Sequence, residues 1–434
     1  MLSCEGQARL GHEVHLAYGP IYGPEGSLLS RVDAFNARCV RGEERTLAGG
    51  LVKPIVTHVV KDLVREVSLV KDWRARIAVR AMVRMLRPDI VHTHSSKAGI
   101  LGRMAAWHCV RAGQAVGVVH TIHGPPFMPV EGSFVRRVKT QLVNWVYTLA
   151  ERTAAQRCHV IVSVADAMTT TFLRRRIGRD ALFVTVRSGI ETEPYTNPEP
   201  GETRMEMRES LGLRDEHFVI GTVARLAEHK GHADLLSAVR GMVDPGKVVL
   251  LWVGDGWLRD SLVSAARAGE NAFNVIELDR FQKPEDQQLI EAWKGVDPTR
   301  ATVVIRGLMP PQRVAGLMRA MDVLAHTSYR EGLPRTVPQA LLAGVCPIAY
   351  DCDGTGEVCV DGVTGRLIAT GDVVALGRAI GELRADPAQR ERLASAGRDS
   401  CLRRFSAETM IEELERVYAL ARSRLEFSGR AGAT

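Results

Sequence analysis

Short apolar segments of β type alternate with longer segments of helical period along most of this 434-residue chain. Proline and glycine stand at most of the joins. In the first half the strand candidates are "EVHLAYG", "DIVHTH", "AVGVVHTIH", "CHVIVSVAD" and "ALFVTVRSG". Helical segments such as "WRARIAVRAMVRMLR" and "AGILGRMAAWHCVRAG" lie between them. This alternation predicts parallel strands joined by crossover helices, which is a doubly wound α/β fold.

The proline-rich stretch "ETEPYTNPEPGETR" interrupts the alternation and is typical of a linker. After it the strand candidates return as "HFVIGTVAR", "KVVLLWVGDG", "ATVVIRG", "DVLAHTS" and "VCPIAYD". We therefore predict two Rossmann-like domains facing a central cleft, with a ligand at the carboxyl ends of the strands. The expected boundaries are 1–195 for the first domain, 196–405 for the second, and 406–434 for a C-terminal helix and tail that cross back to the first.

The N-terminus departs from this pattern. The segment "LSCEGQARLG" predicts a helix, and the strand "EVHLAYG" follows it. A doubly wound domain normally begins with a strand and a glycine-rich turn before its first helix. Two interpretations follow: the fold starts differently, or the chain begins inside the first βα unit.

Composition indicates an ordinary globular protein, with 45% hydrophobic and 25% charged residues. The sequence contains no run of eighteen apolar residues, so it predicts no membrane span. Its polar N-terminus does not resemble a secretory leader. The cysteines are scattered without a C-x-x-C pair. We expect reduced thiols in a cytoplasmic protein rather than disulfides or a zinc site.

The basic residues cluster in two segments, "FVRRVKTQLVNWVYTLAERTAAQR" and "TTTFLRRRIGRD", although the net charge is only +7. Such clusters attract nucleic acid, an anionic membrane surface or a phosphorylated substrate. The first segment is amphipathic and carries Trp145 and Tyr147. A half-buried surface helix is the simpler interpretation, and peripheral membrane attachment is the alternative.

Two cations follow a strand in "GTVARLAEHKGHADLL". Arg225 and Lys230 lie in the loop between the strand end at Val223 and a helix that we expect to open at Gly231. At the carboxyl end of a strand, a guanidinium and an ammonium suit a phosphate or diphosphate. Spacing alone predicts two solvated loop cations equally well.

Histidines mark two strand ends in the first domain. In "VVHTIHGPPF", His120 and His123 lie at one edge, where a histidine can act as a base or hydrogen-bond a reacting group. His92 and His94 in "VHTH" share one face of a strand. A metal cluster of these imidazoles is the weaker interpretation, because no carboxylate or cysteine follows at ligand spacing.

Short polar segments elsewhere have a structural explanation beside a functional one. In "DCDG", Asp351 and Asp353 favour a turn, although such a pair can also hold a divalent metal. In "HSSKAGILGRM", Ser95 or Ser96 is expected to cap the following helix.

The stretch "SYREGLPRTVPQALLAG" places an acid, Glu331, in a glycine and proline turn before an apolar helix. Gln339 lies eight positions later, and Thr336 with Gln339 has the spacing of a T-x-x-Q capping box. The capping box explains the amide, but it does not explain an acid directly after the strand "DVLAHTS".

Together these motifs resemble the retaining glycosyltransferases of family 4, which have the GT-B fold. The motifs run in order along the chain as "GHEV", "DIVHTHSSKAG", "HTIHG", "SGIETEPY", "GTVARLAEHKG", "WVGDG", "MDVLAHTSYREGLP", "ALLAGVCPIAYDCDGTGEV" and "DGVTGRL". The ordered set is more specific than any one member.

The resemblance implies a UDP- or GDP-sugar donor on the second domain and an acceptor on the first. It assigns Arg225 and Lys230 to the donor diphosphate, and His123 to the sugar and reaction centre. Glu331 matches the first acid of the family's E-x7-E motif, which contacts the donor sugar. The turn of Gly332, Leu333 and Pro334 would face the phosphates, and Gly307 lies in the region that meets the base.

Three features depart from the family. Gln339 replaces the second acid, which contacts the ribose in relatives, so an amide would make a weaker contact. The segment 277–301 before "TVVIRG" is longer than usual. The first strand and its glycine-rich loop are missing, so we expect a start upstream of Met1 and otherwise an open edge or gap in the first sheet.

The resulting prediction is a hexosyl or amino-hexosyl transferase that uses no cofactor and no metal. We expect a saccharide or lipid-linked acceptor, polysaccharide or glycolipid assembly, and no nucleic-acid partner. We expect it in the cytoplasm, and we consider peripheral attachment to the inner membrane face as a second expectation. The alternatives are a GT-B sugar-nucleotide epimerase and a catalytically impaired nucleotide-sugar-binding protein.

Overall fold

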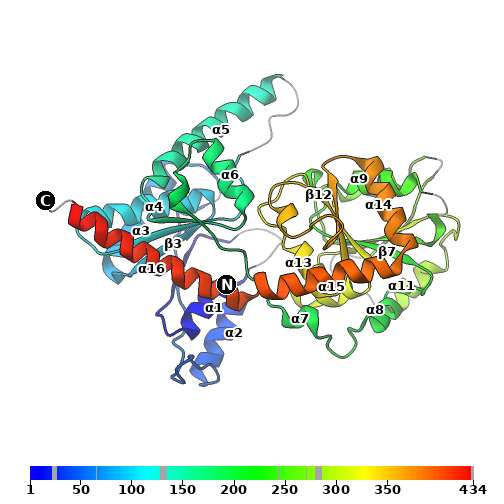
Figure 1. Cartoon of the computed structure of the whole chain (residues 1–434), viewed down its shortest axis with the longest axis horizontal. Helices are drawn as coiled ribbons and strands as arrows, with labels where there is room; N and C mark the ends of the chain where they lie inside the picture. Colours follow the sequence, from blue (N-terminus) through cyan, green and yellow to red (C-terminus); the bar gives the residue numbers. More distant parts are fainter. Residues whose placement is uncertain are drawn as a thin grey trace. The chain divides into compact units, whose positions relative to one another are not determined.

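The computed structural model describes residues 1–21, 27–64, 66–127, 134–242, 245–269, 271–278 and 286–431. The chain forms two compact units, one made of Met1–Gly189 with Ala407–Thr434 and the other of Ile190–Ser406. Each unit contains parallel strands covered by helices (Figure 1). Part of the long segment 277–301, namely 279–285, lies outside the described residues.

The first unit alternates strands and helices, as the apolar pattern predicts. Its strands are β1 (His15–Tyr18), β2 (Val56–Val59), β3 (Ile90–His94), β4 (Gly117–Ile122), β5 (Val160–Ser163) and β6 (Phe183–Thr185). Its helices are α1 (Leu2–Arg9), α2 (Leu29–Val40), α3 (Leu69–Leu86), α4 (Ser96–Arg111), α5 (Phe134–Ala155), α6 (Asp166–Arg174) and α16 (Ala407–Ala431). The apolar pattern did not predict β2, whose residues are mostly exposed.

The strands of this unit belong to two separate parallel sheets, β1–β2 and β3–β4–β5–β6. Among the described residues, no backbone ladder joins β1 to β3, so the expected interruption of the first sheet is present. The smaller sheet has a core of its own, in which Ala8 of α1 and Phe35 of α2 are buried with Ile55.

The C-terminal helix α16 belongs to the first unit. Its Leu414, Val417 and Ala421 are buried against Val119 of β4 and Val160 of β5. It also packs against α1, which lies beside it in Figure 1. The last helix of the chain therefore covers the sheet that the first half of the chain builds.

The second unit is a single parallel sheet in the order β13-β12-β11-β7-β8-β10-β9. Its strands are β7 (Phe218–Val223), β8 (Val248–Val253), β9 (Asn274–Glu277), β10 (Thr302–Gly307), β11 (Val323–His326), β12 (Cys346–Asp351) and β13 (Arg366–Ala369). Its helices are α7 (Glu193–Thr196), α8 (Arg204–Ser210), α9 (His232–Arg240), α10 (Arg259–Arg267), α11 (Asp286–Trp293), α12 (Pro311–Arg319), α13 (Thr336–Leu342), α14 (Val373–Ala385) and α15 (Pro387–Arg404).

The order of these strands reverses direction between β7 and β11. From β7 the chain proceeds to β8 on one side, and it later returns to place β11, β12 and β13 on the other side. In an open parallel sheet, the carboxyl ends of the strands at such a switch point are where ligands bind. The loops after Val223 and His326 therefore mark the expected ligand edge of this unit.

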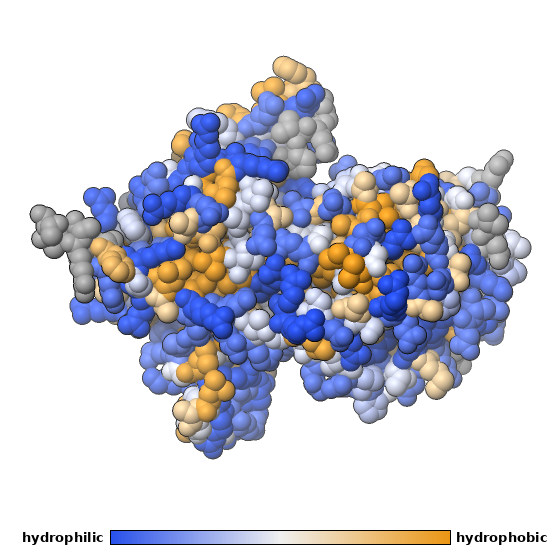
Figure 2. Space-filling view, in the orientation of Figure 1, coloured by the Kyte–Doolittle hydropathy of each residue, from blue (hydrophilic) through white to orange (hydrophobic). Residues whose placement is uncertain are grey.

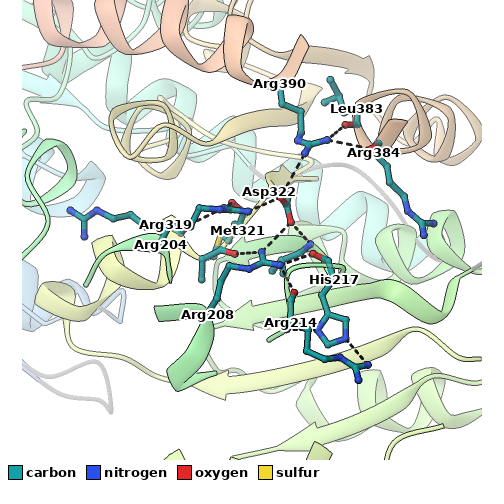
Figure 3. A network of polar contacts seen from close by, with 12 residues as sticks. Arg204, Arg208, Arg214, His217, Arg319, Met321, Asp322, Leu383, Arg384 and Arg390 are labelled. Carbon is teal, nitrogen blue, oxygen red and sulfur yellow. Dashed lines mark hydrogen bonds and ion pairs between the residues drawn. The ribbon is translucent and has the colours of Figure 1, made fainter. Parts of the chain in front are cut away.

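A network of charged groups lies at the opposite edge, where β11 begins (Figure 3). The carboxylate of Asp322 accepts hydrogen bonds from Arg204 at 2.7 Å, from Arg208 at 3.3 Å and from the Val219 N–H at 2.7 Å. Arg390 of α15 approaches the same carboxylate at 3.8 Å. Because the network ties α8, α15, β7 and β11 together at the amino ends of the strands, we assign it a structural role.

The stretch predicted to be a linker is part of the second unit's fold. Residues Glu193–Thr196 form α7, with proline in its first turn, and α7 packs on α12 and α13. Tyr195 of this helix is buried. Thr203 and Glu206 then form a capping box at the start of α8. The prediction failed because proline can begin a helix as readily as it can break one.

Within the described ranges, no helix is both long enough and apolar enough to cross a membrane. All eight cysteines carry free thiols, and all but Cys4 are buried.

Candidate functional site

The predicted phosphate ligand Lys230 and the predicted sugar contact Glu331 form an ion pair in the second unit. Lys230 follows β7 and Glu331 follows β11, so the pair lies at the switch point of the sheet. Both side chains are largely buried, with 18% and 17% of their surfaces exposed. The pair brings a cation and an acid together at the edge where a ligand is expected.

Close backbone contacts hold the two loops together. The Tyr329 N–H donates to the carbonyl of His229 at 2.9 Å, and the Thr327 hydroxyl donates to the carbonyl of Lys230 at 3.0 Å. Gly231 lies between the loop and α9 with a φ of 66°, and a Cβ there would lie 2.1 Å from the Thr327 carbonyl oxygen. Only glycine fits this position, so "KG" at 230–231 has a geometric explanation.

Glu331 is an ionised acid held from several sides. Burial alone would raise its pKa, but its electrostatic interactions with His326 and Lys230 and its hydrogen bonds from Lys230 and Ser328 bring that pKa below its usual value. Its backbone N–H donates to the Asp353 carboxylate at 2.8 Å. At neutral pH the carboxylate is therefore charged, and it can accept hydrogen bonds from a sugar hydroxyl.

His326 belongs to the same cluster, and the sequence analysis did not assign it a role. Its Nε2 lies 3.5 Å from Oε1 of Glu331, and its Nδ1 lies 3.3 Å from the Thr336 hydroxyl. The ring is buried, and burial lowers its pKa to about 4. The available sequence signal was its place at the last position of β11, which is one of the two strands at the switch point.

The pKa of His326 predicts acid-sensitive folding. Between pH 6.5 and about 4 the unfolded histidine binds a proton that the folded one does not, so the free energy of unfolding should fall as the pH is lowered through this window. We expect His326→Asn, which removes this titration, to reduce the loss between pH 7 and pH 4.5 by about 2 kcal/mol. Urea unfolding at both pH values measures it, and an unchanged loss in the variant would contradict the assignment.

Arg225 is exposed after β7, and its guanidinium lies 5.6 Å from the centre of the Trp257 ring. The same edge holds Gly307 at the end of β10, with a φ of 72° and its carbonyl accepting the Gly254 N–H at 2.9 Å. A Cβ on Gly254 would lie 2.0 Å from the carbonyl oxygen of Ala224. The ends of β7, β8 and β10 therefore approach one another closely around the predicted ligand residues.

The turn after Glu331 is mostly buried. Gly332, Leu333 and Pro334 have little exposed surface, and the Gly332 carbonyl accepts the N–H of Gly354 at 3.1 Å. This contact holds the turn against the "DCDG" segment. The carboxylate of Asp353 bonds the backbone of Glu331, and residues 353 and 354 form the predicted turn.

The predicted capping box of Thr336 and Gln339 is wrong. Helix α13 starts at Thr336 itself, its N-cap is Arg335, and no side chain caps it. Thr336 instead faces His326, while a hydrogen bond from the Gln339 side chain acts on the hydroxyl of Tyr195. Burial raises the pKa of Tyr195 to about 12, which the nearby Arg335 and Gln339 only partly offset. Gln339 therefore contacts α7 rather than its own helix start.

In the first unit, His123 is exposed directly after β4. Its Nε2 lies 2.9 Å from Nδ1 of His94, and the two rings stack at 5.2 Å. His92 and His94 share one strand face, as predicted, with ring centres 4.3 Å apart. His92 hydrogen-bonds Tyr418 of α16 at 2.8 Å, which agrees with the expected hydrogen-bonding use.

His120 does not lie at the edge with His123. Its ring is buried, and its Nδ1 lies 3.0 Å from the Thr93 hydroxyl. A Cβ on Gly99 would lie 2.3 Å from this ring, so α4 approaches β4 over the imidazole. The pairing of the two histidines was wrong because three residues along a strand place side chains on opposite faces.

The capping prediction for Ser95 and Ser96 is also wrong. Ser95 is the N-cap of α4, but no side chain there accepts a backbone hydrogen bond. Its φ of 62° with a ψ of 163° is a region that residues other than glycine rarely occupy. The backbone strain lies beside His94, at the carboxyl end of β3.

Two family models match the chain, one over each half. Residues 3–193 match the model of Glycosyltransferase Family 4. Residues 203–400 match the model of Glycosyl transferases group 1. The second range contains the Lys230–Glu331 pair, and the first contains His123.

Relatives of known name are similar over most of their length. The chain is 24% identical over 345 residues to the UDP-Gal:alpha-D-GlcNAc-diphosphoundecaprenol alpha-1,3-galactosyltransferase of Escherichia coli, covering 79% of this chain and 78% of that protein. It is 28% identical over 372 residues to the 2-deoxystreptamine N-acetyl-D-glucosaminyltransferase of Streptomyces fradiae, covering 84% and 79%.

Among solved structures, Anabaena HepE in complex with UDP superposes with a TM-score of 0.64 at 19% identity, covering 94% of this chain and 100% of that chain. An identity this low shows the shared fold alone. Together with the parallel sheets of both units, it confirms the predicted GT-B type of α/β fold.

Proposed function

Because the chain belongs to the family 4 glycosyltransferases of GT-B fold, we propose that it transfers a hexosyl or amino-hexosyl group from a UDP- or GDP-sugar to a saccharide or glycolipid acceptor, with retention of configuration. The second unit would hold the donor and the first the acceptor. No metal and no cofactor enters the proposed reaction.

One observation carries the donor part of the proposal. The Lys230–Glu331 pair lies at the switch point of the second unit's sheet, and Arg225 follows the same strand as Lys230. Parallel sheets of this kind bind nucleotides at that point. In a nucleotide-sugar donor the diphosphate adjoins the sugar. A cation suited to the diphosphate, with an acid beside it suited to the sugar, matches this arrangement.

The chemistry needs positive charge at the leaving group. Cleavage of the bond between sugar and phosphate leaves negative charge on a nucleoside diphosphate, and cations already in place stabilise it. Lys230 has three N–H donors, so it can keep one hydrogen bond to Glu331 and give others to phosphate oxygens. Arg225 would add a planar two-pronged contact to the same diphosphate.

We propose that Glu331 accepts hydrogen bonds from hydroxyls of the donor sugar. Its low pKa keeps it charged, and its contacts with Lys230 and His326 hold it in one position. In the retaining reaction the acceptor attacks from the face that the leaving group vacates, and a departing phosphate oxygen takes the acceptor proton. Glu331 then needs no covalent bond to the sugar.

The remaining assignments follow the family resemblance. We propose that Gly307 meets the base, that the turn of Gly332, Leu333 and Pro334 lies along the phosphates, and that His123 contacts the reacting sugar. Gln339, whose side chain lowers the pKa of the nearby Tyr195 hydroxyl, would contact the ribose through its amide.

We further propose that the acceptor is presented at the inner face of a membrane. The Escherichia coli relative is named for a diphosphoundecaprenol substrate, which is a lipid-linked sugar. The relative from Streptomyces fradiae is named for 2-deoxystreptamine, so family membership alone does not select a lipid. Cytoplasmic polysaccharide or glycolipid assembly is the setting that we propose.

A thermal-shift screen tests the class and the donor together. We expect one of UDP and GDP, and its sugar conjugates, to raise the melting temperature of the full chain, because ligand that binds only the folded state stabilises it. At a ligand concentration of about 100 Kd the gain is about 2.7 kcal/mol.

The outcomes of the screen separate the alternatives. Binding followed by transfer to an added acceptor supports the proposal. Interconversion of the donor sugar without acceptor would indicate an epimerase, and binding without any turnover would indicate an impaired binding protein. No shift with either nucleotide or its sugars would contradict the donor assignment.

A further inference from the structure

Helix α5 has its apolar side chains on the side that faces solvent. At about 100° per residue, Phe134, Val138, Leu142, Trp145 and Leu149 form one stripe along the helix. We call these five residues the α5 stripe. Each of them is between 47% and 81% exposed. An ordinary surface helix buries such a stripe and exposes its polar side chains.

The packed side of α5 carries polar and small residues instead. Its buried residues are Asn144, Glu151, Ala154 and Ala155, and none of them belongs to the stripe. Glu151 forms an ion pair with Arg103 of α4 at 2.6 Å, with almost no exposed surface on either side chain. The buried charge pair therefore lies on the packed side of the helix, and the stripe remains exposed in the described structure.

The charges around the stripe indicate what covers it. Arg137 and Lys139 are exposed on the first turns of α5, about 100° to either side of the centre of the stripe, and no acid precedes Glu151 on this helix. In Figures 1 and 2, hydrophobic and strongly hydrophilic residues adjoin on the surface where α5 lies. A helix with an apolar face, a tryptophan and flanking cations suits the interface of a bilayer that contains anionic lipids.

A second copy of the chain fits this surface less well. Two α5 helices packed in parallel along their stripes would bring Arg137 and Lys139 of both copies close together, and like charges at an interface disfavour association. An antiparallel pair would offer these cations no exposed acid, because Glu151, the one acid on α5, is buried. Anionic lipid headgroups would instead neutralise these cations while the acyl region accepts the stripe.

We propose that α5 docks the chain on an anionic membrane surface through the α5 stripe, with Arg137 and Lys139 contacting lipid headgroups. This inference depends on the proposed function only for the membrane as the place of the acceptor, since docking itself needs no sugar donor and no reaction.

Vesicle flotation of the full chain tests the proposal. We expect binding to vesicles of phosphatidylglycerol and phosphatidylethanolamine, little binding to pure phosphatidylcholine, and release at high salt because exposed charges are screened. Leu142→Asn with Trp145→Gln should lower the apparent affinity for the anionic vesicles by about tenfold or more. Because these side chains are exposed, the variant should keep the wild-type melting temperature.

A control variant replaces two apolar residues of the second unit that are even more exposed than Leu142 and Trp145. Met205→Gln with Val374→Asn should bind vesicles as the wild type does. Absence of vesicle binding, or equal loss in both double variants, would overturn the proposal. So would a dimer in light scattering that only the stripe variant dissociates, because it would indicate a second copy as the occupant. The nucleotide-dependent thermal shift of each variant separates a failure of docking from a failure of the proposed function.

Discussion

Lys230→Ala is expected to abolish the thermal stabilisation by nucleoside diphosphate and to lower sugar transfer by about 100- to 1,000-fold. The change removes the ammonium that we assign to the diphosphate. It also leaves the Glu331 carboxylate without its lysine partner, so a negative charge would face the phosphates unopposed. Both effects weaken the binding of the donor and the stabilisation of the leaving group. Melting curves with UDP and GDP and initial transfer rates measure them.

The second unit offers a matched control for this experiment. Lys294 forms an ion pair with Glu291 at 2.6 Å, but both side chains are 68% exposed and far along the chain from the motif residues. Lys294→Ala should leave the nucleotide response and the transfer rate unchanged. Lys230→Arg, which keeps the charge, should keep part of the nucleotide response. If Lys230→Ala retained the full thermal shift, the phosphate site would have to be sought elsewhere.

The sequence predicted the location of this pair for a simple physical reason. Lys230 and Glu331 are 101 positions apart, but each lies in the loop that follows an apolar strand, and the carboxyl ends of parallel strands meet at one edge. Their direct contact was not predictable, because the apolar pattern does not determine the order of the strands in the sheet. His326 escaped notice for the same reason: its relation to Glu331 depends on how the chain turns after β11.

The capping errors have a different physical cause. Thr336 and Gln339 have the spacing of a capping box, but spacing does not decide whether the threonine precedes the helix or begins it. The helix starts one residue earlier than a capping threonine requires, and both side chains have tertiary partners, His326 and Tyr195. Contacts with distant segments of the chain, rather than the local spacing, therefore decide where these two side chains lie.

The same limit applies to α5, whose period correctly predicts an amphipathic helix. Periodicity shows which residues share a face, but it does not show which face is packed. The expectation of a half-buried helix followed the rule that apolar faces turn inward. Here Glu151 pairs with Arg103 in the interior, while the apolar stripe faces solvent.

Glu151→Ala is therefore expected to destabilise the first unit by about 3–5 kcal/mol. Arg103 has no exposed surface, and it would keep only its hydrogen bond to the Gly99 carbonyl at 3.0 Å. Its Nη1 already lacks a hydrogen-bond partner in the described structure. An unpaired guanidinium would remain buried between α4 and α5, and the cost of that charge exceeds the loss of the bond itself.

Scanning calorimetry of the full chain measures the effect, with nucleotide added to identify the transition of the second unit. A loss of this size should lower the melting temperature of the first unit's transition by about 10 °C. Replacing both partners, with Arg103→Met and Glu151→Leu, should recover most of the loss because no charge remains buried. A cost of Glu151→Ala below about 1 kcal/mol would mean that the pair is solvated in solution and does not orient α5.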